Sequence, residues 1–197
     1  MTGVMARVRG RIGRGLFALR YRMRFAHLGA HAYLAAPFRL DNPAGISLGS
    51  RSMMARGGWL YCHDQAARIV IGEGCELGMN NHIAAVGELH IGNHVLTASN
   101  VYIGDNVHGY EDVGVPVMHQ PVRLKGPVSI GDGSWLGENV CVIGARIGRN
   151  CVIGANSVVT CDIPDYSVAV GAPARVIKQY DPVTKVWRSV PTVTDKE

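Results

Sequence analysis

His108 is the side chain of this sequence best suited to acid–base chemistry. It lies in the run DNVHGYED, among several carboxylates. A histidine has an ordinary pKa of roughly 6.5, so its neutral imidazole can accept a proton from a hydroxyl group near neutral pH. A carboxylate from Asp105, Glu111 or Asp112 could orient the ring by accepting a hydrogen bond from its second nitrogen, and the sequence leaves open which one does so. We predict that His108 is a general base, with His119 as the reserve candidate.

The element that must position His108 is a six-residue repeat. From residue 130 to 163 an aliphatic residue followed by Gly recurs about every six residues, and the same register is visible from Ile71 to Gly104. Such a period predicts one short strand per repeat, with the aliphatic side chain inward and three repeats in each triangular coil. Because such coils bury a core only by stacking, the sequence predicts an all-β fold, a parallel β-helix, whose irregular first coil begins near Ile46.

The repeat is interrupted once. It stops after Val107 and resumes at Val128, and residues 108–127 carry prolines and charges but no Ile-Gly or Leu-Gly pair. A connection of this length without a repeat is more often functional than incidental in a compact domain. We predict a long loop excursion over 108–127, with His108 at its start.

Two outward positions on the coils are candidates for contact with a substrate. Trp135 follows Ser134, which the repeat places inward, so the alternation of a strand points the indole ring outward. An exposed aromatic residue of this size either lines a cleft or is packed under the loop excursion, and both would look identical in the sequence. Asn80 also points outward, whereas Asn81 falls on the small inward position, where it would form a polar stack inside the core.

Composition narrows the class of protein. The chain has 197 residues, the length of a single domain, and no apolar run of the roughly 18 residues that a membrane-spanning helix requires. Its five cysteines are an odd number without a Cys-x-x-Cys pair, which argues against a disulfide framework and a zinc knuckle. Cys75 and Cys151 fall on the small inward position and are predicted to be buried thiols. We expect an intracellular, cytoplasmic protein.

The basic residues are concentrated at the N-terminus. The net charge is +5, yet eight arginines precede the first acidic residue, Asp41, so the rest of the chain carries −3 by difference. Apolar residues at helical spacing predict a short helix within 1–28, with a stripe of Val4, Val8, Ile12, Leu16, Leu19 and Met23. Two roles for this helix stay open: capping the end of the β-helix, or peripheral contact with the anionic inner face of a membrane. No nucleic-acid-binding motif accompanies the arginines, so nucleic acid is not an expected partner.

These patterns divide the chain into three parts. Residues 1–36 form a basic helical leader or cap, residues 37–177 the β-helix, and residues 178–197 a polar C-terminal tail. Trp187 is the residue of the tail that we expect to dock onto the body.

Three runs of this sequence resemble the hexapeptide-repeat acyltransferases, most of all the branch that O-acetylates sugars and surface polysaccharides. They are Trp135–Val140, Ile153–Thr160 and Gly171–Ile177. The resemblance covers the chain from about residue 46 to 177. It implies a left-handed β-helix, a homotrimer with clefts between subunits, and acetyl-coenzyme A as co-substrate with no metal required.

The resemblance also implies roles for individual residues around the acceptor. The branch carries a histidine followed by Gly-Tyr and acidic residues before its loop, which supports His108 as the base and adds Tyr110 as a substrate-binding residue. This chain has Asn106 where relatives have an additional histidine. An aromatic residue at the place of Trp135 lines the cleft near the thioester in the family. Asn80 is the further candidate for acceptor binding.

For the donor, the resemblance implies a groove between coils of adjacent subunits. The positions that it assigns to coenzyme binding are Gly154, Ala155, Thr160, Arg175 and Lys178. The small residues would admit the pantetheine arm, and the two cations would lie near the phosphates. Relatives usually have Lys directly after the threonine, where this chain has Cys161, so one phosphate contact is missing.

Together, the residues and the resemblance predict an acetyl-coenzyme A-dependent O-acetyltransferase of a sugar hydroxyl, in which the acceptor attacks the thioester directly. N-acetylation of an amino or nucleotide sugar is the first alternative, because the same base would serve. A γ-type carbonic anhydrase shares the fold, but its paired zinc ligands are separated by four residues, whereas His90 and His94 are separated by three. A non-catalytic solenoid scaffold is the remaining alternative, since periodicity reports fold alone. The sequence does not identify the acceptor sugar or the length of the acyl group.

Overall fold

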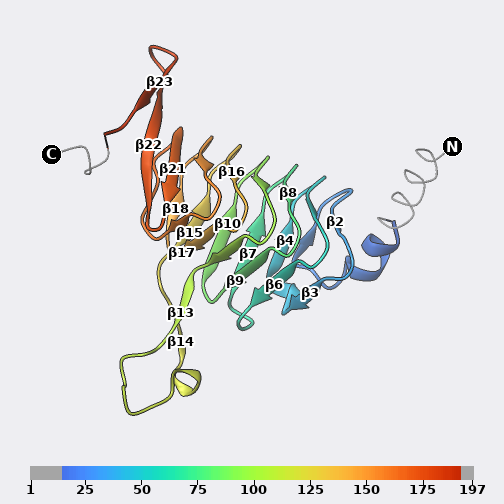
Figure 1. The fold of residues 1–197 in the computed structure, drawn as a ribbon. Helices are drawn as coiled ribbons and strands as arrows, with labels where there is room; N and C mark the ends of the chain where they lie inside the picture. The colour runs from blue at the N-terminus through green and yellow to red at the C-terminus, as the bar shows by residue number, and fades with distance from the viewer. Residues whose placement is uncertain (1–14, 192–197) are drawn as a thin grey trace.

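A computed structural model describes residues 15–191, which form a β-solenoid with a short helix at one end and an antiparallel hairpin at the other (Figure 1). Three sheets of short parallel strands surround one core as a left-handed β-helix. In each coil the chain passes through sheet A, then sheet B, then sheet C. The predicted fold class is therefore confirmed.

The strands of the three sheets are short and follow one another coil by coil. Sheet A contains β1 (His27–Leu28), β4 (Ile46–Leu48), β7 (Arg68–Ile71), β10 (Glu88–Ile91), β15 (Val128–Ile130) and β18 (Arg146–Ile147). Sheet B contains β2 (Tyr33–Leu34), β5 (Met53–Met54), β8 (Glu76–Leu77), β11 (Leu96–Thr97), β16 (Trp135–Leu136), β19 (Val152–Ile153), β21 (Ser167–Gly171), β22 (Ala174–Asp181) and β23 (Val186–Ser189). Sheet C contains β3 (Arg39–Asp41), β6 (Trp59–Cys62), β9 (His82–Ala85), β12 (Tyr102–Gly104), β17 (Cys141–Ile143) and β20 (Val158–Val159), and a 3-10 turn, η1 (Pro43–Gly45), precedes β4.

The core is a stack of like residues on like. In sheet A, Ile46, Ile69, Leu89 and Val128 lie in register on successive coils, and each is at most 2% exposed. Full burial of an aliphatic side chain contributes roughly 1.5–3 kcal/mol. A slip by one residue would turn each of these side chains to solvent, so the hexapeptide period sets the register.

The corners between sheets B and C explain several asparagines. Asn80, Asn100, Asn139 and Asn156 occupy equivalent corner positions with φ between 56° and 60°. Asparagine tolerates this left-handed conformation better than other residues with a Cβ. The side chains also join coils, since Asn80 Nδ2 donates to Asn100 Oδ1 at 3.2 Å. The outward position of Asn80 is confirmed, and its residue type is accounted for by this corner.

The N-terminal end is closed by an aromatic cluster rather than by the predicted stripe. A helix covers 15–21 in the described part of the chain, and its Phe17 is 6% exposed, stacking on Tyr21 and contacting Tyr33 and Phe38 edge-on. The aromatic side chains bury more apolar area than leucine or methionine and take the face toward the coil. The helix therefore caps the solenoid.

The described members of the predicted stripe do not face the coil. Leu16, Leu19 and Met23 are 61%, 83% and 92% exposed, whereas Val4, Val8 and Ile12 lie outside the described residues. The first coil begins at β1, which pairs with β4 and lies within the stretch assigned to the leader. Within 15–191, none of the helices is long and apolar enough to cross a membrane.

The interruption of the solenoid is an arm with a β-ribbon at its base. We call residues 106–124 the arm: β13 (Asn106–His108) pairs antiparallel with β14 (Val122–Leu124), and a 3-10 turn, η2 (Val117–His119), lies near its tip. Figure 1 shows it projecting from the side of the solenoid. The predicted loop excursion is thus confirmed. Its paired base begins at residue 106, two residues before the expected start at 108, because β13 and β14 are extended segments that can pair once they leave the coil.

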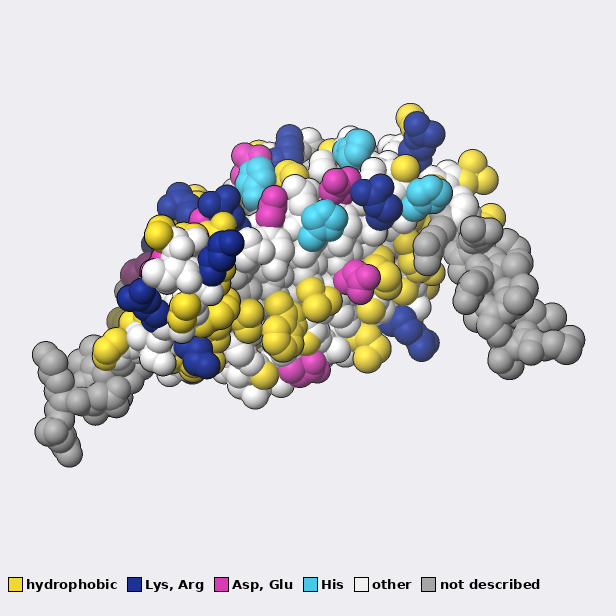
Figure 2. Space-filling model, turned by 90° about the horizontal axis from the view of Figure 1, so that it is seen from above, with side chains coloured by type: hydrophobic (Ala, Val, Ile, Leu, Met, Phe, Trp, Pro, Cys, Tyr) yellow, Lys and Arg dark blue, Asp and Glu magenta, His cyan; other side chains and the backbone are white. Residues whose placement is uncertain are grey.

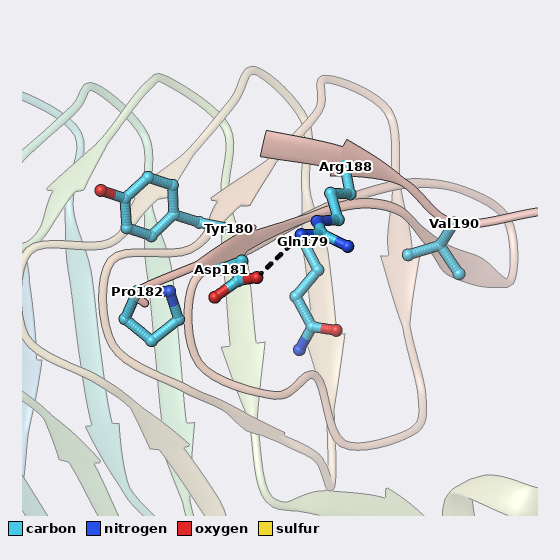
Figure 3. Close-up of a pocket in the computed structure, with 6 residues that line it drawn as sticks. All are labelled: Gln179, Tyr180, Asp181, Pro182, Arg188 and Val190. Carbon is cyan, nitrogen blue, oxygen red and sulfur yellow. Dashed lines mark ion pairs between the residues drawn. The ribbon is translucent and has the colours of Figure 1, made fainter. Parts of the chain in front are cut away.

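The C-terminal segment extends sheet B instead of forming a separate tail. β22 pairs antiparallel with β21, and β23 pairs with β22. Trp187 docks within this hairpin, with its ring 5.4 Å from that of Tyr180. Figure 3 shows the surface hollow beside it, where Arg188 and Asp181 form an ion pair at 3.2 Å.

Asp105 anchors the base of the arm, and its replacement by alanine should destabilise the protein. The side chain is fully buried, and its two oxygens accept hydrogen bonds from the backbone N–H groups of Val86 and Gly87, both at 2.8 Å. Asp105→Ala leaves two partly buried N–H donors without partners, so we expect a loss of about 2–4 kcal/mol in the free energy of unfolding. Denaturant titration measures this. Asp105→Asn keeps one acceptor and should lose clearly less; equal losses would contradict the assignment.

Candidate active site

His108 lies at the end of β13, exposed on the arm. Its backbone is held by antiparallel pairing with Val122, so the base of the arm fixes where the side chain starts. Among residues 15–191 the imidazole makes no hydrogen bond to a side chain or backbone group. Both ring nitrogens are therefore without a partner in this part of the chain, which suits a group that exchanges a proton with a bound molecule.

The three carboxylates that could orient His108 have other partners within one chain. Asp105 accepts from the backbone at the base of the arm. Glu111 forms an ion pair with Arg123 at 3.1 Å, and backbone N–H groups of Glu111 itself and Tyr110 lower the pKa of its carboxyl. Asp112 accepts from the backbone N–H of Gly114 at 2.9 Å. Among residues 15–191, none of the three accepts a hydrogen bond from the His108 ring.

Trp135 is exposed as predicted, but it lies on a different side of the solenoid from His108. Ser134 is fully buried and Trp135 is 47% exposed on sheet B. The arm follows β12 of sheet C and is followed by β15 of sheet A. It therefore projects from the corner between sheets C and A, which is opposite sheet B. One chain therefore does not bring His108 and Trp135 together, and the arm of the same chain does not cover the indole ring.

Trp135 belongs to an apolar row along sheet B. Pairing places Leu96, Trp135, Val152 and Val168 side by side on successive strands, with Leu96 45% exposed. We call these four residues the sheet B row. Figure 2 shows hydrophobic side chains following one another along this side of the solenoid. A contiguous apolar stripe of this kind on a soluble surface marks a contact site.

Four of the five predicted coenzyme residues cluster on the last coils of sheet B. Gly154 and Ala155 follow β19 at the corner, and a Cβ at Gly154 would lie 2.8 Å from the Val170 side chain, so only glycine fits there. Arg175 pairs with Val170 and Lys178 with Val168 on β22. Both cations are exposed, and within 15–191 neither forms an ion pair.

Thr160 is separated from this cluster. Thr160 directly follows β20 on sheet C, whereas Gly154 lies at the corner before that strand. The Thr160 side chain is exposed. Cys161 beside it is also exposed, whereas Cys75 and Cys151 are buried as predicted. Burial also raises the pKa of the Cys62 thiol to about 11, so that thiol is protonated and unreactive near neutral pH.

Comparison with known proteins agrees with this architecture. Residues 127–161 match the family model of the hexapeptide repeat of succinyl-transferase. The putative lipopolysaccharide biosynthesis O-acetyl transferase WbbJ of Escherichia coli is 52% identical over 61 residues, 30% of this chain and 31% of that protein. The maltose O-acetyltransferase of Clostridium difficile 630 is 27% identical with a TM-score of 0.58, covering 90% of this chain and 88% of that one. The chain is therefore similar to hexapeptide-repeat acyltransferases, in sequence over short stretches and in fold over most of its length.

The sequence similarity to curated proteins covers short stretches, whereas the similarity of fold covers most of this chain. The N-acyltransferase AntD of Bacillus cereus, a mutant of which was solved with dTDP and coenzyme A, has a TM-score of 0.71 at 18% identity, over 83% of this chain and 89% of that one. At that identity the likeness concerns the fold. The chain spans less than a third of the length of the curated relatives that it matches.

The chain also carries an aromatic row that the sequence analysis missed. On sheet C, Arg39 lies over Trp59 at 4.3 Å, Trp59 stacks on His82 at 4.0 Å, and His82 meets Tyr102 edge-on. The four residues recur at intervals of 20 to 23 positions, about one coil, and that spacing was the available signal. Within the described chain, Nε2 of His82 is buried without a hydrogen-bond partner.

The aromatic row on sheet C should make the free energy of unfolding depend on pH. Burial, and then the charge of Arg39, lower the pKa of His82, while Asp41 opposes them. Because the unfolded chain then binds a proton more readily, stability should fall as pH drops below the ordinary histidine value of roughly 6.5. His82→Phe keeps the stack without the titration, so its unfolding free energy should depend less on pH between about 5 and 7. Parallel pH dependence of the two proteins would refute this assignment.

Proposed function

We propose that this chain is an acetyl-coenzyme A-dependent O-acetyltransferase that acts on a sugar hydroxyl of a surface polysaccharide or its precursor. The observation that carries the proposal is the arm, because it interrupts a hexapeptide β-helix once and presents an exposed histidine at the end of its first strand. The similarity to WbbJ and to the maltose O-acetyltransferase favours oxygen as the acceptor atom.

The reaction needs one base and a place for the donor. The neutral imidazole of His108 takes the proton of the acceptor hydroxyl as its oxygen attacks the thioester carbonyl. The carbon–sulfur bond then breaks, and the leaving thiolate recovers the proton from the imidazolium. Backbone N–H groups would stabilise the negative oxygen in between. No covalent bond to the enzyme is formed in this scheme.

The residues present fit a phosphorylated thioester donor. Gly154 and Ala155 add little side-chain bulk at this corner, which would let an extended chain lie close to the backbone, although Val170 already fills the Cβ side of Gly154. Arg175 and Lys178 are exposed cations on the adjacent hairpin, suited to phosphate groups. Thr160 and Cys161 lie farther along the corner strand, and the missing lysine at 161 leaves the phosphate contacts to the hairpin.

We propose a homotrimer because one chain holds the two halves of the site on opposite sides. His108 springs from the corner between sheets C and A, whereas Trp135 and the coenzyme cluster lie on sheet B. A head-to-tail contact between copies would bring the arm of one chain to the sheet B row of the next, and three such contacts close a ring. The imidazole, the indole and the donor groove then share one cleft between subunits, with Tyr110 and Asn80 as candidate acceptor contacts.

The test is binding and turnover of acetyl-coenzyme A. Calorimetry should detect donor binding, and free thiol should appear with at least one neutral sugar, oligosaccharide or nucleotide sugar of a panel. Arg175→Gln with Lys178→Gln should weaken donor binding by about tenfold or more. Turnover with amino sugars alone would move the proposal to N-acetylation. If the wild-type chain bound no donor, the protein would be a non-catalytic solenoid.

A further inference from the structure

The helix that caps the solenoid has a second side, which no other residue of 15–191 covers. Leu16 and Leu19 occupy positions i and i+3 on one side of the helix, and Met23 follows in the turn at 22–24. Their side chains are 61%, 83% and 92% exposed. Phe17 and Tyr21 face the other way, into the aromatic cluster. The helix therefore has two apolar sides, of which one closes the coil and the other is exposed to solvent.

The surroundings of the exposed side are cationic. Arg20, Arg22 and Arg24 alternate with the exposed apolar residues, and the sequence contains no Asp or Glu before Asp41. Asp41 is itself neutralised, since it lies 2.9 Å from Arg39 and accepts from the indole of Trp59. An apolar stripe flanked only by positive charge is complementary to a surface that is apolar inside and negatively charged outside.

A hollow of about 600 Å³ borders this stripe. Met23 and Arg24 line it from the turn after the helix, Arg68 of β7 lines it from the third coil, and residues 42–45 complete the lining together with Gln65. One terminal nitrogen of Arg68 is held by the carbonyls of Gln65 and Ala67, at 2.6 and 2.9 Å, so the guanidinium is fixed in place. The nearby Asp64 carboxylate is already bound by the backbone N–H groups of Ala66 and Ala67.

We propose that the segment 15–24 docks on an anionic membrane surface. Leu16, Leu19 and Met23 enter the boundary between headgroups and acyl chains, while Arg20 and Arg22 bind lipid phosphates at its edge. Arg24 and Arg68 receive one further lipid phosphate in the hollow between them. The capping role of Phe17 and Tyr21 is kept, so the helix both closes the solenoid and holds the protein at the membrane.

The position of the segment suits this role. It lies at the end of the solenoid opposite the C-terminal hairpin, and the arm projects from the side between them (Figure 1). Docking by this end leaves the arm free. In the proposed homotrimer, cyclic symmetry would place three such segments at one level, so weak single contacts would combine. The docking itself requires neither the trimer nor the acetyltransferase activity.

The experiment is co-sedimentation of the full chain with vesicles of phosphatidylcholine, with or without about one third phosphatidylglycerol. We expect binding to the anionic vesicles, little binding to the neutral ones, and a fall in binding with added salt. The triple change Leu16→Gln, Leu19→Gln and Met23→Gln should lower partitioning by about tenfold or more. Thermal unfolding of this variant should match the wild type, because Phe17 and Tyr21 are unchanged.

A matched control changes an exposed apolar residue far from the helix. Val183→Gln, at the turn of the C-terminal hairpin and 88% exposed, should leave partitioning unchanged. Equal binding to neutral and anionic vesicles, or equal binding by the triple variant, would overturn the proposal. A change in oligomeric state of the triple variant, measured by light scattering, would also overturn it, since a second copy would then cover the stripe. Turnover with soluble acceptors is measured separately, so failure here leaves the proposed chemistry standing.

Discussion

Replacing His108 with alanine should leave acetyl-coenzyme A binding intact and lower turnover by roughly a hundred- to ten-thousand-fold, the usual contribution of a positioned base. The side chain is exposed at the end of β13 and bonds to nothing else in residues 15–191, so its removal costs little folding energy. The loss should appear in kcat with KM for the donor nearly unchanged, because the imidazole acts on the acceptor proton in the transition state.

His119→Ala is the matched control on the same arm. His119 ends the turn η2 and is exposed like His108, so a general effect of losing an arm histidine would appear in both variants. We expect near wild-type turnover for His119→Ala. Inactivation by this change, with His108→Ala still active, would transfer the role of base to the reserve candidate. Loss of donor binding in His108→Ala would mean that the residue positions the coenzyme instead.

The coils could be predicted from the sequence because a solenoid repeats one local rule. The inward residue of each repeat, such as Ile103 or Leu136, stacks on its neighbour in the next coil, and both are nearly inaccessible. The same register predicted that Asn81 and Ser134 point inward, which the structure confirms. Local periodicity and tertiary packing give the same answer here, so a single chain without relatives is enough.

The ends and the interruption could not be predicted in this way. At the N-terminus the helical spacing of Leu16 and Leu19 was real, but their side chains face solvent, because the ring of Phe17 fills the space over the first coil. Spacing gives the angle between residues on a helix, not which side meets the body. The β-ribbon of the arm and the C-terminal hairpin depend on pairing between segments, which no six-residue period records.

The candidate active site also has parts that the six-residue period predicts and parts that depend on pairing between distant segments. The exposure of Trp135 follows from alternation within its repeat, and the closeness of Arg175 to the Gly154 corner comes from the antiparallel return of β22. The separation of His108 from Trp135 follows from where the arm leaves the triangle, which is visible only when strands are assigned to sheets. That separation makes the assembly of copies the decisive question for activity.

Placing a carboxylate in the sheet B row should therefore separate the copies and remove activity together. Leu96 is 45% exposed, pairs with Trp135, and has Glu76 as its other neighbour. Leu96→Glu would put an unpaired charge into each contact of the proposed trimer, and desolvating such a charge costs several kcal/mol. In the single chain the new charge stays in solvent, so only weak repulsion from Glu76 remains, within about 1 kcal/mol.

Light scattering should show a trimer for the wild type and a folded monomer for Leu96→Glu, with turnover reduced by about a hundredfold or more, since His108 and Trp135 then lie on opposite sides of separate molecules. Val183→Glu, on the exposed hairpin turn, should stay trimeric and active. A monomeric but fully active Leu96→Glu would mean that one chain contains the complete site, which would reject the proposed cleft between subunits. A trimeric Leu96→Glu would move the contact away from the sheet B row and leave the arm to reach another face.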